Sequence, residues 1–417
     1  MNAIGFILLQ LFIIFTAAKV MADLSRRLKQ PEVIGELLAG VILGSYALGV
    51  IGEPNDYLIG VFHDRSTATE ALNLVLETFS ELGVIVLLFS VGLETRLSEM
   101  MNVGRRAASA GVLGVIIPFV LGYGFMQLSG EPTVDSLFLA TAMVATSVGI
   151  TARVLQEMGV LQSTEAKIIL AAAVLDDILA LIFLTTVTGI AGTGAINMGS
   201  IIIIIFQAFI FITLVILAGK HLISRYHASL SRLHIPDAPL VVALGTMMGL
   251  AGLASYFRLA AIIGAFLAGM LFAELPERNA LEEKVRPIYH FLVPFFFVMT
   301  GANVDWSLLI MRETLGFAIV VTLLAIVGKA IAGCIAGWGL KRRSIMVLSV
   351  GLVPRGEVGL IVAGLGLSMN AIDLNLFSVV VTMSIATTIV VPPVLKLLYA
   401  KQRTAMDVQN GASNTTT

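Results

Sequence analysis

Residues 167–186 form a mostly apolar run with two adjacent carboxylates, Asp176 and Asp177, at its centre. About 20 apolar residues is the length that a helix needs to cross a bilayer. A carboxylate at that depth costs a few kcal/mol, roughly 3 or more, unless it faces a partner or a water-filled cavity. Because neighbours on a helix point about 100° apart, one partner is not expected to satisfy both acids. The run therefore predicts a membrane helix in which one acid is paired and the other takes up and releases a cation or proton.

Long apolar runs recur along the whole chain. Of its 417 residues, 58% are hydrophobic and only 13% are charged, about half the charged share of a soluble domain. The net charge of −1 gives no indication of a nucleic-acid partner. The sequence contains no glycine-rich phosphate-binding motif, so we expect no bound nucleotide. We expect an all-α polytopic membrane protein with about 13 transmembrane helices, near residues 3–22, 31–50, 70–93, 107–128, 136–158, 164–191, 198–220, 237–255, 259–275, 288–303, 314–338, 343–368 and 374–399.

Lysine and arginine are concentrated in alternate loops. The clusters at 26–29, 105–106 and 341–343 fall on one side of the membrane, together with Lys401 and Arg403. Because cytoplasmic loops carry an excess of basic residues, we expect the N-terminus outside and the C-terminus in the cytoplasm. An odd number of spans agrees with this. The chain is predicted to be a multi-pass protein of the cell (inner) membrane, with membrane lipid as its surroundings.

An odd number of spans also fits two six-helix halves joined by one extra helix. The second half then starts on the opposite side of the membrane, as in transporters built from inverted repeats. Residues 147–153 and 349–355 share the pattern S-V-G-x-x-x-R, and they lie in the fifth span of each half. We therefore expect two inverted six-helix repeats.

Two other spans bring polar side chains to membrane depth. Lys329 lies well inside the eleventh span, where it needs a carboxylate partner, and one lysine neutralises only one of two aspartates. Thr146 and Ser147 in the fifth span supply hydroxyls that suit a hard cation. Structural alternatives exist for both spans. Lys329 fits a fixed counter-charge, and the hydroxyls fit bonds to their own helix backbone.

The twelfth span is predicted to be broken. Pro354 lacks an N–H and clashes with the preceding turn, so the helix should kink or unwind there. At membrane depth an unwound backbone must be buried in protein or line a cavity. Arg355 and Glu357 can compensate the partial charges of the half-helix ends. A local salt bridge that only holds the kink fits these two residues equally well.

Six segments taken together carry a resemblance to a known family. They are QPEVIGELLAGVILG (30–44), ELGVIVLLFSVGLE (81–94), ATSVGITARVL (145–155), AAVLDDI (172–178), the Gly-Lys pair at 328–329 and GLVPRGEVGLI (351–361). The combination resembles the monovalent cation:proton antiporter-2 family, and within it the bacterial sodium/proton antiporters of the NapA type.

The resemblance implies a homodimer in which each subunit has a dimerisation domain and a mobile core. In the core, two broken helices, here spans five and twelve, cross beside the ion site. The implied antiporter domain covers residues 1–400, with core helices near 107–191 and 314–399, dimerisation helices near 3–93 and 237–303, and a linker helix at 198–220. From its composition, the polar segment 401–417 is expected to be a disordered cytoplasmic tail.

The resemblance also implies roles for single residues. Asp177 matches the principal ion- and proton-binding carboxylate, and Asp176 matches the acid that pairs with the core lysine, here Lys329. The hydroxyls at 146–147 match polar residues of the first crossing helix, and Glu357 matches the acid of the second. Paired aspartates resemble the electrogenic branch of the family.

We therefore expect a secondary active antiporter that exchanges Na⁺ or Li⁺ for H⁺ by alternating access, with the cation at Asp177 and Asp176 and without a cofactor. A K⁺/H⁺ antiporter of the same fold is the nearest alternative, because carboxylates, hydroxyls and carbonyls suit both ions. A gated channel would need a selectivity filter, and a membrane sensor would need an output domain. An enzyme would need a nucleophile–base pair or a set of metal ligands. None of these is recognisable in the sequence.

Overall fold

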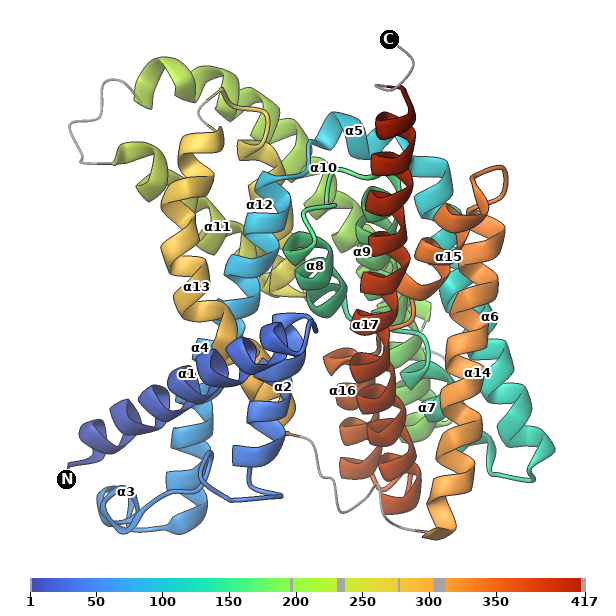
Figure 1. Ribbon diagram of the computed structural model, residues 1–417. Helices are drawn as coiled ribbons and strands as arrows, with labels where there is room; N and C mark the ends of the chain where they lie inside the picture. The colour runs from blue at the N-terminus through green and yellow to red at the C-terminus, as the bar shows by residue number, and fades with distance from the viewer. Residues whose placement is uncertain (1, 196–197, 231–236, 277, 304–311, 414–417) are drawn as a thin grey trace. The chain divides into compact units, whose positions relative to one another are not determined.

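The computed structural model describes residues 2–195, 198–230, 237–276, 278–303 and 312–413. Within these ranges the regular structure is helical throughout, with seventeen helices and no strand (Figure 1). Nine of the described helices are long and apolar enough to cross a membrane. The predicted all-α membrane protein is confirmed.

Four of the thirteen expected spans differ from a single long helix. Two contain the short helices α2 (Glu32–Leu43) and α12 (Ala261–Phe272), and spans five and twelve each divide into two half-helices. A half-helix pair reaches across a bilayer only when its two parts are counted together. The number of bilayer crossings therefore stays a prediction.

The chain divides into two compact units that alternate along the sequence. The boundary passes through helix α9 (Thr164–Thr193), between Asp176 and Asp177. The dimerisation, linker and core roles expected from the resemblance stay predictions. Unit 1 consists of Met1–Asn102 and Asp177–Leu315, and unit 2 consists of Val103–Asp176 and Gly316–Thr417.

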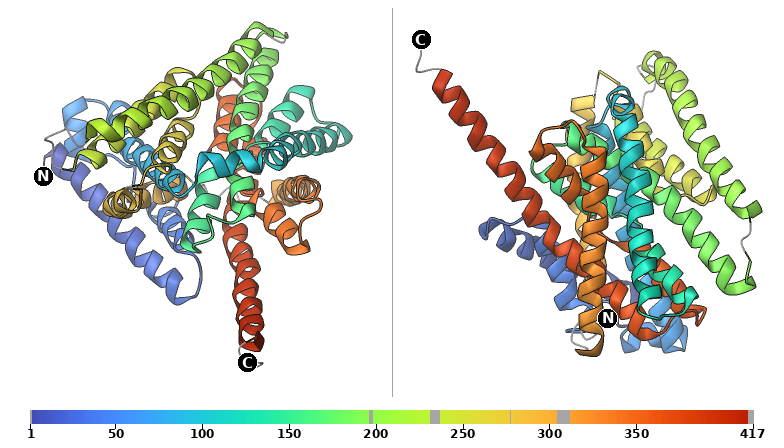
Figure 2. Two further views of the ribbon diagram at one scale, coloured as in Figure 1. Left: turned by 90° about the horizontal axis from the view of Figure 1, so that it is seen from above. Right: turned by 90° about the vertical axis from the view of Figure 1, so that its right-hand side faces the viewer.

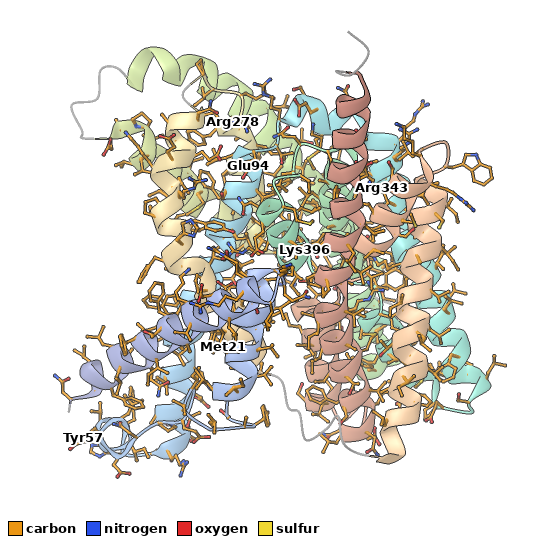
Figure 3. The ribbon with its side chains drawn as sticks, viewed as in Figure 1. Met21, Tyr57, Glu94, Arg278, Arg343 and Lys396 are labelled. Atoms are coloured by element: carbon orange, nitrogen blue, oxygen red, sulfur yellow. The ribbon has the colours of Figure 1, made fainter. Side chains whose placement is uncertain are left out.

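Unit 1 has an apolar core shared by α1 (Ala3–Arg27), α2, α3 (Asp56–Phe62), α4 (Arg65–Leu93) and α13 (Arg278–Ala302). The ring of Phe295 packs against those of Phe15 and Phe79, with centroids 6.3 and 5.3 Å away. Tyr57 on α3 is by contrast well exposed (Figure 3). The other helices of the unit are α5 (Leu97–Asn102), α10 (Met198–Leu230), α11 (Ala238–Tyr256) and α12, together with the second half of α9.

Glycines set the closest helix contacts in unit 1. A Cβ atom added to Gly269 on α12 would lie 2.2 Å from the carbonyl oxygen of Phe89, and one added to Gly92 on α4 would lie 2.4 Å from that of Phe266. Small residues let membrane helices approach until their backbones touch. The α4–α12 contact therefore depends on the absence of a side chain at both positions.

Unit 2 holds two long helices that run side by side, α6 (Gly104–Leu128) and α14 (Arg312–Ala336) (Figure 2). A Cβ atom on Gly328 would lie 3.0 Å from Cγ of Pro118, and the rings of Phe125 and Phe317 have centroids 4.9 Å apart. The other helices of this unit are α7 (Thr133–Ala142), α8 (Val148–Glu157), α15 (Arg342–Gly351), α16 (Glu357–Ser368) and α17 (Leu374–Ser413), together with the first half of α9.

Both interrupted helices lie in unit 2, and their unwound segments contact each other. Residues 143–147 separate α7 from α8, and residues 352–356 separate α15 from α16. The Ser147 N–H donates to the Pro354 carbonyl at 2.8 Å across the two segments. The break that Pro354 predicts is present, and α15 ends three residues before it because proline disfavours a helical residue ahead of it.

Helix α17 continues to Ser413, past the position at which the sequence predicts a tail to begin. Residues 414–417 lie outside the described ranges. The predicted disorder of the segment 401–417 stays a prediction.

Candidate functional site

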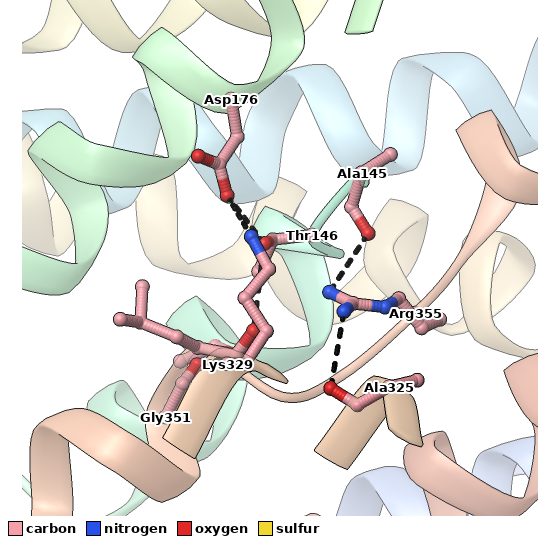
Figure 4. A network of polar contacts seen from close by, with 9 residues as sticks. Ala145, Thr146, Asp176, Ala325, Lys329, Gly351 and Arg355 are labelled. Carbon is pink, nitrogen blue, oxygen red and sulfur yellow. Dashed lines mark hydrogen bonds and ion pairs between the residues drawn. The ribbon is translucent and has the colours of Figure 1, made fainter. Parts of the chain in front are cut away.

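Asp176 is the centre of a buried polar cluster in unit 2. Its Oδ2 atom accepts a hydrogen bond from Lys329 Nζ and another from Thr146 Oγ1, both at 2.5 Å (Figure 4). Asp176 and Lys329 are both 0% exposed. The donors come from α14 and from the unwound segment after α7, so three elements far apart in the sequence meet at one carboxylate.

Glycines on α6 and α14 leave space for the Lys329 side chain. A Cβ atom on Gly114 of α6 would lie 3.0 Å from Lys329 Nζ and 3.6 Å from Asp176 Oδ1. A larger residue at 114 would therefore occupy the space beside the ion pair. Since α6 also touches α14 at Gly328, two glycines allow the Lys329 head group to lie between the helices.

Arg355 joins the two unwound segments to α14. Its guanidinium donates to the Ala145 carbonyl at 3.2 Å and to the Ala325 carbonyl at 3.4 Å, and its side chain is fully buried (Figure 4). Ala325 lies one turn before Lys329 on α14. Arg355 thus places a second positive charge near Asp176, and it gives a hydrogen-bond partner to the Ala145 carbonyl of the unwound segment.

The backbone of Arg355 is held from α17. Its N–H donates to Thr387 Oγ1 at 3.1 Å, and its carbonyl accepts from Thr388 Oγ1 at 2.7 Å. A further hydroxyl, that of Thr151, donates to the Gly351 carbonyl at 3.0 Å. These polar groups of the interrupted helices are therefore paired with specific neighbours, which lowers the cost of burying them in a membrane protein.

The two oxygens of the Asp176 carboxylate differ in their contacts. Its Oδ1 atom is buried and accepts no hydrogen bond from the described residues. Asp177, the next residue on α9, is 4% exposed and points about 100° away around the helix. Carboxylate oxygens are hard ligands, so two successive buried carboxylates on one helix are chemically suited to a monovalent cation.

The structure brings together four of the seven residues singled out from the sequence. Asp176, Lys329 and Thr146 meet directly, and Arg355 lies beside them. Ser147 contributes its backbone N–H to the contact between the unwound segments, and Asp177 is the first residue of the second segment of unit 1. Glu357 is the first residue of α16, but its side chain lies outside the described part of the chain.

Sequence reasoning missed several participants in this cluster. The adjacent pair Thr387 and Thr388 stands in the apolar run of α17 and was a visible signal. The carbonyls of Ala145 and Ala325 carry no signal, because every residue has one. The role of Gly114 was equally hidden, since it follows from the position of Lys329 in three dimensions.

Interrupted helices that meet beside a buried ion pair define a class of protein, the secondary transporters that bind their substrate at unwound helix segments. A model of the family described as sodium/hydrogen exchanger, transmembrane, matches residues 11–401. The chain belongs to the sodium/hydrogen exchanger family. The resemblance to monovalent cation:proton antiporters is thereby confirmed.

Relatives of this chain are similar over nearly their full length. The high-affinity Na⁺/H⁺ antiporter NhaS3 of Synechocystis is 38% identical, with 94% of this chain and 90% of that protein covered. The Na⁺/H⁺-K⁺ antiporter GerN of Bacillus cereus is 33% identical, with coverage of 95% and 97%. Among solved structures, the sodium proton antiporter MjNhaP1 of Methanocaldococcus jannaschii matches with a TM-score of 0.66 at 16% identity, over 95% of this chain and 97% of that one. This last match shows a shared fold.

Proposed function

We propose that the chain is a secondary active antiporter that exchanges Na⁺, or Li⁺, for H⁺ across the cell membrane by alternating access. The observation that carries the proposal is the second buried carboxylate of α9. Lys329 and Thr146 both bond to Asp176, and Asp177 adds a further acid at the same depth of the helix. Lys329 neutralises Asp176, and the neighbouring carboxylate supplies a second acid that can take up a transported cation or a proton.

Exchange follows from competition for a carboxylate. When it is deprotonated, Asp177 binds a cation, and when it is protonated, it has no charge with which to hold one. The occupied forms of either kind cross the low-dielectric barrier more cheaply than a bare carboxylate. Binding of one ion therefore displaces the other, and the gradient of one ion drives transport of the other.

The polar cluster has matching roles in this proposal. Asp176, through its unused Oδ1, and the hydroxyls of Thr146 and Ser147 contribute oxygen ligands near the cation. Lys329 compensates the charge of Asp176, and Arg355 and Glu357 compensate charge at the half-helix ends. Rigid attachment of both broken helices to Arg355 lets them move as one body when access changes sides.

K⁺/H⁺ exchange is a second candidate function. GerN, a relative of comparable length, is named as a Na⁺/H⁺-K⁺ antiporter. Hydroxyl, carbonyl and carboxylate oxygens ligate both ions, so the residues of the cluster permit either.

We also propose that the protein is a homodimer in the inner membrane, with the N-terminus outside and the C-terminus in the cytoplasm.

Proton flux in liposomes tests the function. The purified protein is reconstituted with a pH-sensitive dye inside the vesicles, and Na⁺, Li⁺ and K⁺ are added outside in turn. We expect Na⁺ and Li⁺ to drive protons across the membrane, whereas choline at the same osmolarity serves as the control. A response to K⁺ alone would replace the first candidate by the second, and no response to any cation would contradict both.

A further inference from the structure

Ser384 on α17 differs from neighbouring hydroxyls of its helix. Ser378, Thr382 and Thr387 each donate to a carbonyl one turn back, at 2.6 to 2.9 Å, as hydroxyls in membrane helices commonly do. The Ser384 side chain is 3% exposed, yet its Oγ atom has no hydrogen-bond partner among the described residues. A buried hydroxyl without a partner costs about 1–3 kcal/mol, so its ligand needs to be identified.

The Ser384 hydroxyl lies at the junction of two half-helices. A Cβ atom placed on Gly359, in the first turn of α16, would lie 3.7 Å from Ser384 Oγ and 3.0 Å from the carbonyl oxygen of Ala142. Ala142 is the last residue of α7, where helix carbonyls have no amide of their own helix to bond and the dipole is negative. The absence of a side chain at Gly359 thus lets a buried hydroxyl and a helix-end carbonyl lie on either side of the same backbone position.

The neighbouring residue of α7 strengthens this assignment. Thr141, directly before Ala142, is fully buried, and its hydroxyl also has no partner among the described residues. By contrast, Ser136 on the same helix donates to the Pro132 carbonyl at 2.8 Å. The unused oxygens in this part of unit 2 therefore coincide with the broken end of α7.

We propose that Ser384 Oγ and the Ala142 carbonyl form a neutral subsite for the transported monovalent cation, separate from the carboxylates of α9. This inference rests on the proposed function and deepens it. Hydroxyl and carbonyl oxygens replace part of the hydration shell of a cation without adding a full negative charge. Such a subsite binds weakly enough to release its ion, which a site on the transport path must do. In the proposed orientation α7 and α16 are the outer half-helices, so the subsite lies on the exit side for Na⁺.

Two matched pairs of variants test the subsite in the full-length protein in liposomes. Ser384→Ala removes the proposed ligand, and Ser378→Ala removes a buried hydroxyl of the same helix that bonds only to its own backbone. Gly359→Ala fills the space, and Gly364→Ala adds the same methyl group to α16 where nothing lies within 4 Å. The readouts are the KM for Na⁺ and for Li⁺, the pH of half-maximal exchange and the melting temperature.

We expect Ser384→Ala and Gly359→Ala to raise the KM for Na⁺ about three- to tenfold, as the loss of one neutral oxygen ligand implies. The KM for Li⁺ should change by a different factor, because the two ions differ in size. Ser378→Ala and Gly364→Ala should stay within about twofold of wild type. At saturating Na⁺ the pH of half-maximal exchange should not move in any variant, since the subsite contains no titratable group.

A Ser384→Ala variant with the KM of Ser378→Ala would overturn the subsite, and a lowered melting temperature with an unchanged KM would assign the position to an ordered water only. Should Gly359→Ala fail to fold, the serine pair still decides. Failure of the subsite is separate from failure of the function. If the wild-type protein exchanges cations and Ser384→Ala behaves normally, only the subsite is contradicted. If the wild-type protein shows no exchange, the proposed function itself is contradicted.

Discussion

The ion pair between Asp176 and Lys329 is fully enclosed, and its two charges stabilise each other. Removing one partner leaves the other charged and buried, which typically costs about 3–5 kcal/mol. Removing both leaves two neutral side chains, so the double variant should be less damaged than the sum of the single ones. The same pair sets the local charge around the cation, which connects its stability to transport.

A double-mutant cycle measures this coupling. Asp176→Asn and Lys329→Gln are each expected to destabilise the protein by roughly 3 kcal/mol or more, and the combined variant by clearly less than the sum. Thermal unfolding of the four purified proteins in the same detergent gives the coupling energy. Additive losses would mean that the two side chains do not interact in the folded protein.

The sequence allowed part of the cluster to be predicted because charges in apolar runs are conspicuous. Asp176, Asp177, Lys329 and Arg355 each stand out in a span where lipid would not tolerate them. What they contact is decided by helices far apart in the chain. The two carbonyls that the Arg355 guanidinium binds were not foreseen, and the salt bridge with Glu357 stays a prediction.

The two breaks differ in how visible they are in the sequence. Pro354 predicts the break after α15. Residues 143–147 contain neither proline nor glycine, so only the resemblance indicated a break there. Unwinding at this second place is stabilised by tertiary partners, including the Arg355 guanidinium and the Pro354 carbonyl. Local propensity alone does not contain that information.

The short internal echo in the sequence does not align these breaks. It pairs residues 147–153 with 349–355, but the unwound segments are 143–147 and 352–356, which is seven residues out of register with that pairing. The seven-residue match is therefore no support for an inverted repeat. Paired half-helices in spans five and twelve are the better argument for one.

The contact between α4 and α12 offers a direct test of helix packing in unit 1. Gly269→Ala places a methyl group 2.2 Å from the Phe89 carbonyl oxygen, so the helices must separate. Gly245→Ala on α11 adds the same group where nothing lies within 4 Å. We expect the first variant to lower the melting temperature, with a loss of about 1–3 kcal/mol from overpacking, and the second to leave it unchanged or slightly raised. Equal melting temperatures would show that the contact tolerates a wider spacing.

The buried charges of the chain bear on whether transport moves net charge. Asp176, Asp177, Lys329 and Arg355 sum to zero when all four are ionised. Na⁺ binding with loss of the Lys329 proton keeps that sum at zero, whereas protonation of Asp177 with Lys329 charged gives +1. Two protons would then move inward for each Na⁺ that moves outward, and the membrane potential would contribute about 2.3 kcal/mol per 100 mV.

Currents on solid-supported membranes after a Na⁺ concentration jump test this stoichiometry. The wild-type protein should give a sustained transport current, and Lys329→Gln should either be inactive or exchange ions without current. A wild-type protein that exchanges briskly but electroneutrally would remove Lys329 from the proton pathway. Asp176 and Lys329 would then be a structural pair beside a one-for-one exchanger.

The most direct test of competition between Na⁺ and H⁺ for Asp177 compares Asp177→Asn with Glu165→Gln in liposomes. The quantity recorded is Na⁺-driven proton release at equal protein density. Both changes neutralise one acid of α9, but Glu165 lies in the first turn of the helix and Asp177 at its buried centre. We expect Glu165→Gln to retain exchange and Asp177→Asn to abolish it while remaining folded, with a melting temperature near that of wild type. Near-normal exchange by Asp177→Asn would contradict the assignment of this carboxylate as the group for which Na⁺ and H⁺ compete.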